Sequence, residues 1–198
     1  MTSFHPALIL IIAALAVYIL PGRLRQIAFI GGPLLALLSV LTMAAGTVWH
    51  YSFIGYELTI LNADATALVF GLVFTLIAFL AALFALHNKN RGEQIAALLY
   101  AAGSLGVTFA GDWLTLFFFW ELMAISSVFL VWYRGVQKSL RAGFRYLVIH
   151  FIGGNLMLFG VLVLVGSGNI LVGPLSGSGS PAFWLILTGV AINAAIPP

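Results

Sequence analysis

The amino-acid sequence predicts an all-α membrane protein, a polytopic bundle of about seven transmembrane helices. The first reason is composition: 63% of the 198 residues are hydrophobic and only 7% are charged, whereas soluble domains average about 45–50% apolar and about 25% charged residues. The second is that apolar runs recur along the whole chain, so a single signal peptide cannot explain them. The third is that basic residues collect at alternate ends of these runs, as in a chain that crosses a bilayer repeatedly.

Composition also excludes several classes of function. The chain has no cysteine, which rules out disulfides, thiolate metal sites and cysteine catalysis. Its net charge of +3 does not indicate nucleic-acid binding, because the basic residues lie at span ends, where topology explains them. No ligand set for a metal or cofactor is evident in the sequence. We therefore expect a lipid-embedded chain with neither nucleic acid as a partner nor a cofactor of its own.

Seven segments approach the roughly 20 residues that a helix needs to cross a hydrocarbon core of about 30 Å. The first and last of them are short, and none has the alternating pattern of a β-barrel strand. The expected spans are Pro6–Leu20, Ile27–Trp49, Asn62–Leu86, Ile95–Ala110, Asp112–Tyr133, Phe144–Gly166 and Ala182–Ile196.

Residues that break or cap helices separate these spans. Pro21-Gly22 closes the first, and Gly111-Asp112 predicts a tight turn in which Asp112 caps the fifth helix. Asp64 is expected to cap the third helix in the same way. The Gly/Ser-rich stretch Gly166–Pro181 predicts a flexible loop.

Charge predicts the orientation of the chain. With seven crossings, all the basic residues fall on one side, and Glu57, Asp64 and Asp112 fall on the other. The basic residues are Arg23, Arg25, Lys89, Arg91, Arg134, Lys138, Arg141 and Arg145. The positive-inside rule assigns the basic side to the cytoplasm. We therefore expect a multi-pass protein of the inner (cytoplasmic) membrane, with its N-terminus outside and its C-terminus inside.

Glu121 is the strongest candidate for chemistry, because it falls near the centre of the fifth span among apolar and aromatic residues. An ionised carboxylate at that depth costs at least about 2.5 kcal/mol on insertion scales, so intramembrane carboxyls are usually functional. One hypothesis is a proton or cation relay. The other is a protonated carboxyl that joins helices by a hydrogen bond.

His150 is the second candidate, in the sixth span near its cytoplasmic end. Tyr146, His150, Gly153 and Gly154 share one helix face by their spacing, and the glycines permit close helix approach. His150 either passes protons inward from cytoplasmic water or bonds a neighbouring helix. The remaining histidines, which are His5, His50 and His87, sit at span ends with no evident partner.

Three stretches resemble the antiporter-like membrane subunits of respiratory complex I, Mrp-type sodium/proton antiporters and membrane-bound hydrogenase-related complexes. Gly111–Val131, which reads GDWLTLFFFWELMAISSVFLV, is similar to the fifth-helix signature of that family, and Ala142–Gly160 is similar to its sixth helix. Gly189–Pro198 resembles the start of its seventh-helix motif.

The resemblance covers roughly residues 60–198 and implies the first half of the antiporter-like fold, which is built from two inverted five-helix repeats with broken helices. It divides the chain into a two-helix segment with an outer loop, 1–60, and the first part of a proton-translocating domain, 61–198, which we expect to be truncated or continued on another chain. Pro197 and Pro198 would mark the break in the seventh helix. Partners implied by the resemblance are other membrane subunits of a hetero-oligomeric complex and protons, with Na⁺ as an alternative exchanged ion.

The resemblance also gives Glu121 the role of the key membrane glutamate and puts Asn193 where the family carries a lysine. In the family that lysine and the glutamate tune each other's proton affinity through opposite charge, and asparagine carries none. Two hypotheses follow. The chain is either a proton- or cation-translocating subunit, centred on Glu121 with His150 as partner, or a structural anchor subunit of a redox complex that does not pump. In neither case is it an enzyme by itself.

Overall fold

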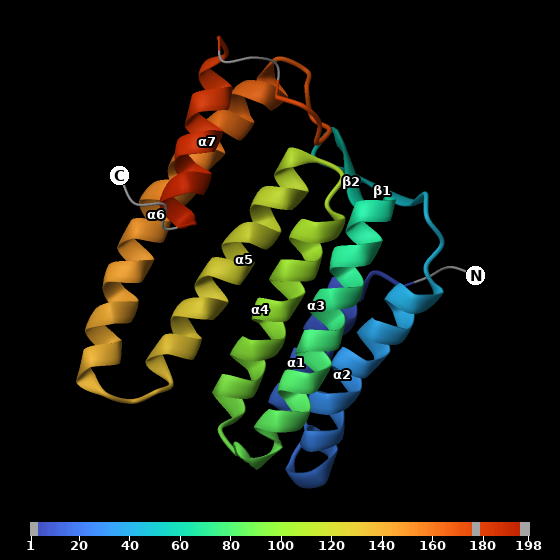
Figure 1. Cartoon of the computed structure of the whole chain (residues 1–198), viewed down its shortest axis with the longest axis vertical. Coiled ribbons are helices and arrows are strands. Elements are labelled where there is room, and N and C mark those ends of the chain that lie inside the picture. Colours follow the sequence, from blue (N-terminus) through green and yellow to red (C-terminus); the bar gives the residue numbers. More distant parts are fainter. Residues whose placement is uncertain (1–3, 176–178, 195–198) are drawn as a thin grey trace.

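The computed structural model describes residues 4–175 and 179–194, which form seven α-helices and one antiparallel β-hairpin (Figure 1). This confirms the predicted bundle of about seven helices, to which the structure adds the hairpin. The elements are α1 (Pro6–Ile19), α2 (Gly22–Thr42), β1 (Thr47–Phe53), β2 (Tyr56–Ala63), α3 (Ala65–Phe84), α4 (Arg91–Phe109), α5 (Trp113–Trp132), α6 (Gln137–Gly166) and α7 (Pro181–Asn193), with a short 3₁₀ turn at Ala85–His87.

Four of these helices, α2, α3, α5 and α6, are long and apolar enough to cross a membrane by length and composition. The helices α1 and α7 are apolar but shorter, with 14 and 13 residues. Large apolar side chains face outward from the bundle, for example Phe84 at 82% exposure and Phe151 at 66%. An apolar outer surface of this extent is unsuited to water and fits a hydrocarbon solvent.

The helices run alternately up and down, so the described connections fall at two ends of the bundle (Figure 1). One end carries the α1–α2, α3–α4 and α5–α6 connections and the basic residues. The other carries the β-hairpin, the α4–α5 turn and the α6–α7 loop. One cluster of buried apolar side chains lies among α1, α2, α3 and α4. A second lies among α5, α6 and α7. The predicted separation of charge thus corresponds to two opposite ends of one bundle.

The β-hairpin corrects the second predicted span, which was drawn as helix through Trp49. The helix α2 ends at Thr42, and Trp49 lies in β1, paired with Leu61 of β2. Gly46 and Gly55 adopt positive φ at the start and the tip of the hairpin, a conformation that glycine reaches without steric cost. Thr47–Phe53 is rich in β-branched and aromatic residues, which favour strands, so hydrophobicity alone misjudged this segment.

Several helices begin earlier than expected: α2 at Gly22 rather than Ile27, and α4 at Arg91 rather than Ile95. The helix α6 begins at Gln137, seven residues before the predicted Phe144, so Lys138 and Arg141 occupy its first turns rather than a loop. The Gly/Ser-rich connection after α6 is a loop as predicted, but its Ile170–Val172 stretch is tied to the α4–α5 turn by backbone hydrogen bonds. Pro197 and Pro198, the predicted break of the seventh helix, lie outside the described residues.

The prediction that the span-end histidines lack partners is wrong for His5. Its side chain is 1% exposed, its Nδ1 accepts a hydrogen bond from Ala7 N, and its Nε2 lies 2.9 Å from Ile60 O. Since Nδ1 accepts, Nε2 carries the hydrogen and donates it, which requires the neutral imidazole. Burial lowers the pKa of this imidazole to about 4. A neutral His5 therefore joins the start of α1 to β2.

His50 and His87 have partners as well. His50 Nδ1 lies 3.2 Å from Thr59 Oγ1, and His87 Nδ1 lies 2.9 Å from Phe84 O. Both contacts join segments close in sequence, across the hairpin for His50 and at the end of α3 for His87. The spacing of apolar residues contains no information about such contacts.

Asp112 holds together the end of the bundle that carries the hairpin. Its side chain is fully buried, and its carboxylate accepts hydrogen bonds from Thr115 N, Thr115 Oγ1 and Thr59 N at 2.8, 2.6 and 2.8 Å. The bonds to Thr115 confirm the predicted N-cap of α5, and the bond to Thr59 adds the hairpin. Next to it, Trp113 N donates to Ile170 O at 3.0 Å. The hairpin and the start of α5 therefore meet at one carboxylate, and the α6–α7 loop is bonded to the backbone beside it.

We predict that Asp112→Ala lowers the free energy of unfolding by about 2–4 kcal/mol, because it leaves Thr59 N unpaired and removes charge-assisted hydrogen bonds. Asp64→Ala is the matched control. Asp64 is exposed and caps α3 through one bond to Ala67 N, so its loss should cost only about 1 kcal/mol. Thermal unfolding of the detergent-solubilised protein compares the two, and equal losses would contradict the role of Asp112 as a junction.

Candidate functional site

Glu121 lies in the middle of α5. It follows Trp113, the first residue of the helix, by eight positions, or about 12 Å of helix axis, and it precedes the end at Trp132 by about 16 Å. Its side chain is half-buried, and its Oε1 is buried without a hydrogen-bond partner among the described residues. The predicted position of a carboxyl at mid-span therefore agrees with the helix bounds.

Two adjacent glycines of α6 make room for this carboxyl and for Asn193. Gly154 faces Glu121, whose Oε1 would clash with a Cβ there and whose Cδ would lie 3.3 Å from it. Gly153 faces α7, where a Cβ would lie 2.8 Å from Cγ of Asn193 and 3.0 Å from Gly189 O. Since the glycines are consecutive, Glu121 and Asn193 approach α6 at the same height. The predicted role of these glycines in close helix approach is confirmed.

His150 lies on α6 one turn from Gly154, toward the basic end of the bundle. It is 6% exposed, and its Nε2 has no hydrogen-bond partner in the described part of the chain. Its ring stacks on Tyr146 with centroids 5.2 Å apart and planes 28° apart. Tyr146 in turn reaches α5, because Ser127 Oγ donates a 3.0 Å hydrogen bond to the Tyr146 hydroxyl oxygen.

Further buried polar atoms gather on the same three helices. Both amide atoms of Asn193 and the Trp120 Nε1 are buried, and none has a hydrogen-bond partner within residues 4–175 and 179–194. Buried polar atoms are nearly always paired, so a group of unpaired ones marks a candidate functional site. Chemically, the group offers one carboxyl and one imidazole that bind protons, and hydroxyl, amide and indole groups that form hydrogen bonds.

The structure thus places the predicted residues Glu121, His150 and Asn193 on three helices that meet around α6. The sequence reasoning missed the hydrogen bond between Ser127 and Tyr146 and the buried indole of Trp120. Each residue was visible as a polar group in an apolar run, but no spacing pattern pairs a residue of one helix with a residue of the next.

Comparisons with known proteins match the helices that carry these residues. Residues 110–191, which contain α5, α6 and most of α7, match the family described as NADH:quinone oxidoreductase/Mrp antiporter, transmembrane region. Over this stretch the chain is similar to the antiporter-like membrane subunits of that family. It is an integral, multi-pass membrane protein.

Two curated relatives and one solved structure illustrate the similarity. The chain is 31% identical over 147 residues to NADH-quinone oxidoreductase subunit N of Desulforamulus reducens, covering 70% of this chain and 31% of the relative. It is 31% identical over 110 residues to Na⁺/H⁺ antiporter subunit A1 of Staphylococcus aureus, covering 52% of this chain and 14% of the relative. It superposes on a chain of the Mrp complex from Dietzia sp. DQ12-45-1b with a TM-score of 0.76 at 25% identity. The superposition covers 96% of this chain and 23% of the other. The chain therefore spans about a third or less of the length of these relatives.

We predict that Gly189→Ala disrupts the packing of α7 on α6. A Cβ at Gly189 would lie 2.6 Å from Gly153 O and 2.7 Å from Met157 N, and backbone atoms cannot move aside without separating the helices. The expected loss of unfolding free energy is about 1–3 kcal/mol. Gly166→Ala, at the open end of α6 with nothing within 4 Å, is the control and should be near neutral. Thermal unfolding in detergent distinguishes them, and similar midpoints for both variants would refute the close contact.

Proposed function

We propose that this chain is a proton-translocating membrane subunit of a multi-subunit complex of the complex I or Mrp-antiporter type, with Glu121 as its proton-binding group. The observation that carries the proposal is the carboxyl of Glu121, held at mid-span against Gly154 with a buried, unpaired oxygen. Ionisable groups inside membranes are rare and are used in proton relays. The relatives' names, a quinone oxidoreductase subunit and a Na⁺/H⁺ antiporter subunit, support this class of function.

A line of groups supports a half-channel between Glu121 and the basic end. Tyr146 and Ser127 are hydrogen-bonded about 9–12 Å from the level of Glu121 along α6 and α5, and His150 lies between the two levels. A hydroxyl both accepts and donates a proton, and an imidazole titrates near neutral pH when unperturbed. In this proposal His150 receives protons from the basic end and passes them to Glu121.

The basic end is proposed to face the cytoplasm, because Lys and Arg are enriched in cytoplasmic loops of membrane proteins. The N-terminus would then lie outside the inner membrane, and the end of α7 would approach the membrane centre from outside. The half-channel would open to the cytoplasm, with other membrane subunits of the complex expected to continue the path. Na⁺ is the alternative exchanged ion.

A second function, an anchor subunit that conducts no ions, is favoured by one observation. Asn193 stands against Gly153 at the height of Glu121, where the resemblance implies a lysine. An amide carries no charge, so it cannot lower or raise the proton affinity of Glu121 as a cation would. The translocation proposal therefore assigns the partner role to His150, and the two functions make different predictions for Glu121 and His150.

We predict that Glu121→Gln lowers proton transport by the assembled complex by about tenfold or more, because glutamine keeps the shape of the side chain but binds no proton. Transport is measured with a pH-sensitive dye in membrane vesicles, and assembly by native gel electrophoresis. Glu57→Gln, which changes an exposed carboxyl in the hairpin, is the matched control and should leave the rate unchanged. Normal assembly with undiminished transport in Glu121→Gln would favour the anchor function.

His150→Phe tests the proposed entry path. Phenylalanine retains the ring that stacks on Tyr146 but cannot carry a proton, so transport should fall by about tenfold or more while assembly is preserved. His87→Phe, at an exposed histidine near the basic end, should have no effect on transport. If His150→Phe transports at the rate of the unchanged protein, protons reach Glu121 by another route.

A further inference from the structure

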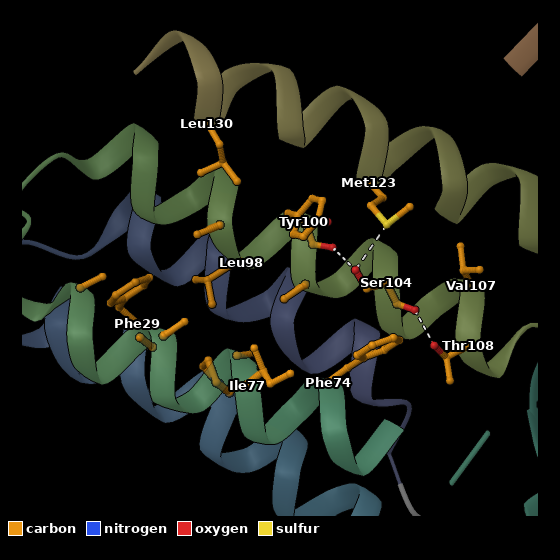
Figure 2. A pocket seen from close by; sticks show the side chains of 17 residues that line it. Phe29, Phe74, Ile77, Leu98, Tyr100, Ser104, Val107, Thr108, Met123 and Leu130 are labelled. Carbon is orange, nitrogen blue, oxygen red and sulfur yellow. Dashed lines mark hydrogen bonds between the residues drawn. The ribbon is translucent and has the colours of Figure 1, made fainter. Parts of the chain in front are cut away.

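A cavity of about 660 Å³ opens between α2, α3, α4 and α5 (Figure 2). Its lining is almost entirely apolar and includes Phe29, Ile77, Leu98, Met123 and Leu130. Three residues with hydroxyl groups also line it, Tyr100, Ser104 and Thr108. Two of these hydroxyls donate to backbone carbonyls of α4, Ser104 to Tyr100 O at 3.1 Å and Thr108 to Ser104 O at 2.8 Å. The cavity therefore suits a hydrocarbon occupant.

The length of this groove matches one leaflet of a bilayer. On one side its lining runs from Phe74 of α3 to Ala85, the first residue after that helix. On the other side it runs from Ala97 to Thr108 of α4. Each stretch is about 16 Å long. Half of a hydrocarbon core of about 30 Å is about 15 Å. The groove is also open to the side, since Ile77 is 56% and Phe74 37% exposed. A chain from the surrounding lipid can therefore enter it laterally.

At the basic end of the groove, the guanidinium of Arg25 has a nitrogen without a hydrogen-bond partner among the described residues. Arg25 precedes Phe29 by one turn of α2 and so lies on the face that lines the groove. The unpaired nitrogen is the buried Nε. Arg91, at the same end, is already engaged, because its guanidinium donates to Tyr18 O at 3.0 Å and Leu20 O at 3.3 Å.

A second unpaired atom lies on α4. Gln94 is 2% exposed; its Nε2 donates to Asn88 O at 2.9 Å, and its Oε1 accepts no hydrogen bond within the described residues. It lies one turn before Ala97 and Leu98, which line the groove. Charge at this end is positive on balance, because Arg23 and Lys89 accompany Arg25 and Arg91, and Glu93 is the acid among them.

We infer that this groove binds an anionic phospholipid, with an acyl chain between α3 and α4 and its phosphate at Arg25. Guanidinium groups form strong, charge-assisted hydrogen bonds with phosphate, and juxtamembrane basic residues attract anionic lipids. A helix of a neighbouring subunit is the competing occupant, but an apolar helix would leave the guanidinium of Arg25 without an anion. This inference does not depend on the proposed proton transport.

The test uses the intact complex in nanodiscs that contain a phosphatidylglycerol carrying a photoactivatable group in its acyl chain. Peptide mass spectrometry should find cross-links on the groove-lining parts of α3 and α4, and a phosphatidylcholine probe should label them less. Arg25→Gln should reduce labelling by the phosphatidylglycerol probe about fivefold. Ala78→Phe, which places a ring in the groove, should abolish it. The controls are Arg134→Gln and Ala142→Phe, both at exposed positions elsewhere, and they should leave labelling unchanged.

Three results would overturn the inference. Equal labelling of the groove by both probes would mean that it does not select an anionic headgroup. Unchanged labelling in Arg25→Gln would mean that Arg25 does not bind the phosphate. An unlabelled groove in the unchanged complex would mean that another protein segment covers it. Proton transport is measured separately and does not enter this test, so failure of the lipid site and failure of the translocation proposal remain distinguishable.

Discussion

The contact of three helices at Gly153 and Gly154 decides what the centre of this protein can contain. Because neither residue has a Cβ, α6 accepts the Glu121 carboxyl from α5 on one side and Asn193 from α7 on the other. Any larger residue at either position would have to displace the polar group that faces it. Close packing at small residues is a general means of helix association in membranes. Here it also brings a carboxyl and an amide to one level of the bundle.

The two ends of the bundle differ in how they are held. At the end with the hairpin, Asp112 and the backbone of its neighbours join three segments that are distant in sequence. At the basic end the connections are short, and Tyr146, Ser127 and His150 lie between that end and Glu121. In the proposed function the first end forms the closed side of the half-channel. The second end forms its entrance, where hydroxyl and imidazole groups can exchange protons with water.

Much of the architecture could be predicted from the sequence, because a bilayer imposes length and hydrophobicity on each crossing. The predicted first span, Pro6–Leu20, differs from α1 by one residue, and Asp112 was recognised as a cap from its place before an apolar run. The hairpin was missed because the second span was extended through Val48 and Trp49 to reach a full crossing, although the β-branched and aromatic residues of Thr47–Phe53 and the glycine at Gly55 favour a hairpin.

The candidate site, too, could be predicted from the sequence only in part. Glu121 and His150 stood out because ionisable residues are rare in hydrocarbon. Which groups they face depends on how the helices rotate and approach, and this is set by contacts between helices far apart in sequence. The juxtaposition of Glu121 with Gly154, and that of Ser127 with Tyr146, could therefore be seen only in three dimensions.

The central claim is that Glu121 binds and releases a proton inside the membrane, and infrared difference spectroscopy measures this most directly. Spectra of the assembled complex, recorded between resting and energised states, report the C=O stretch of a protonated carboxyl. If Glu121 is the proton-binding group, a carboxyl band changes on energisation and is missing from the spectrum of Glu121→Gln. An identical difference spectrum in that variant, with the complex intact, would show that Glu121 does not bind the proton.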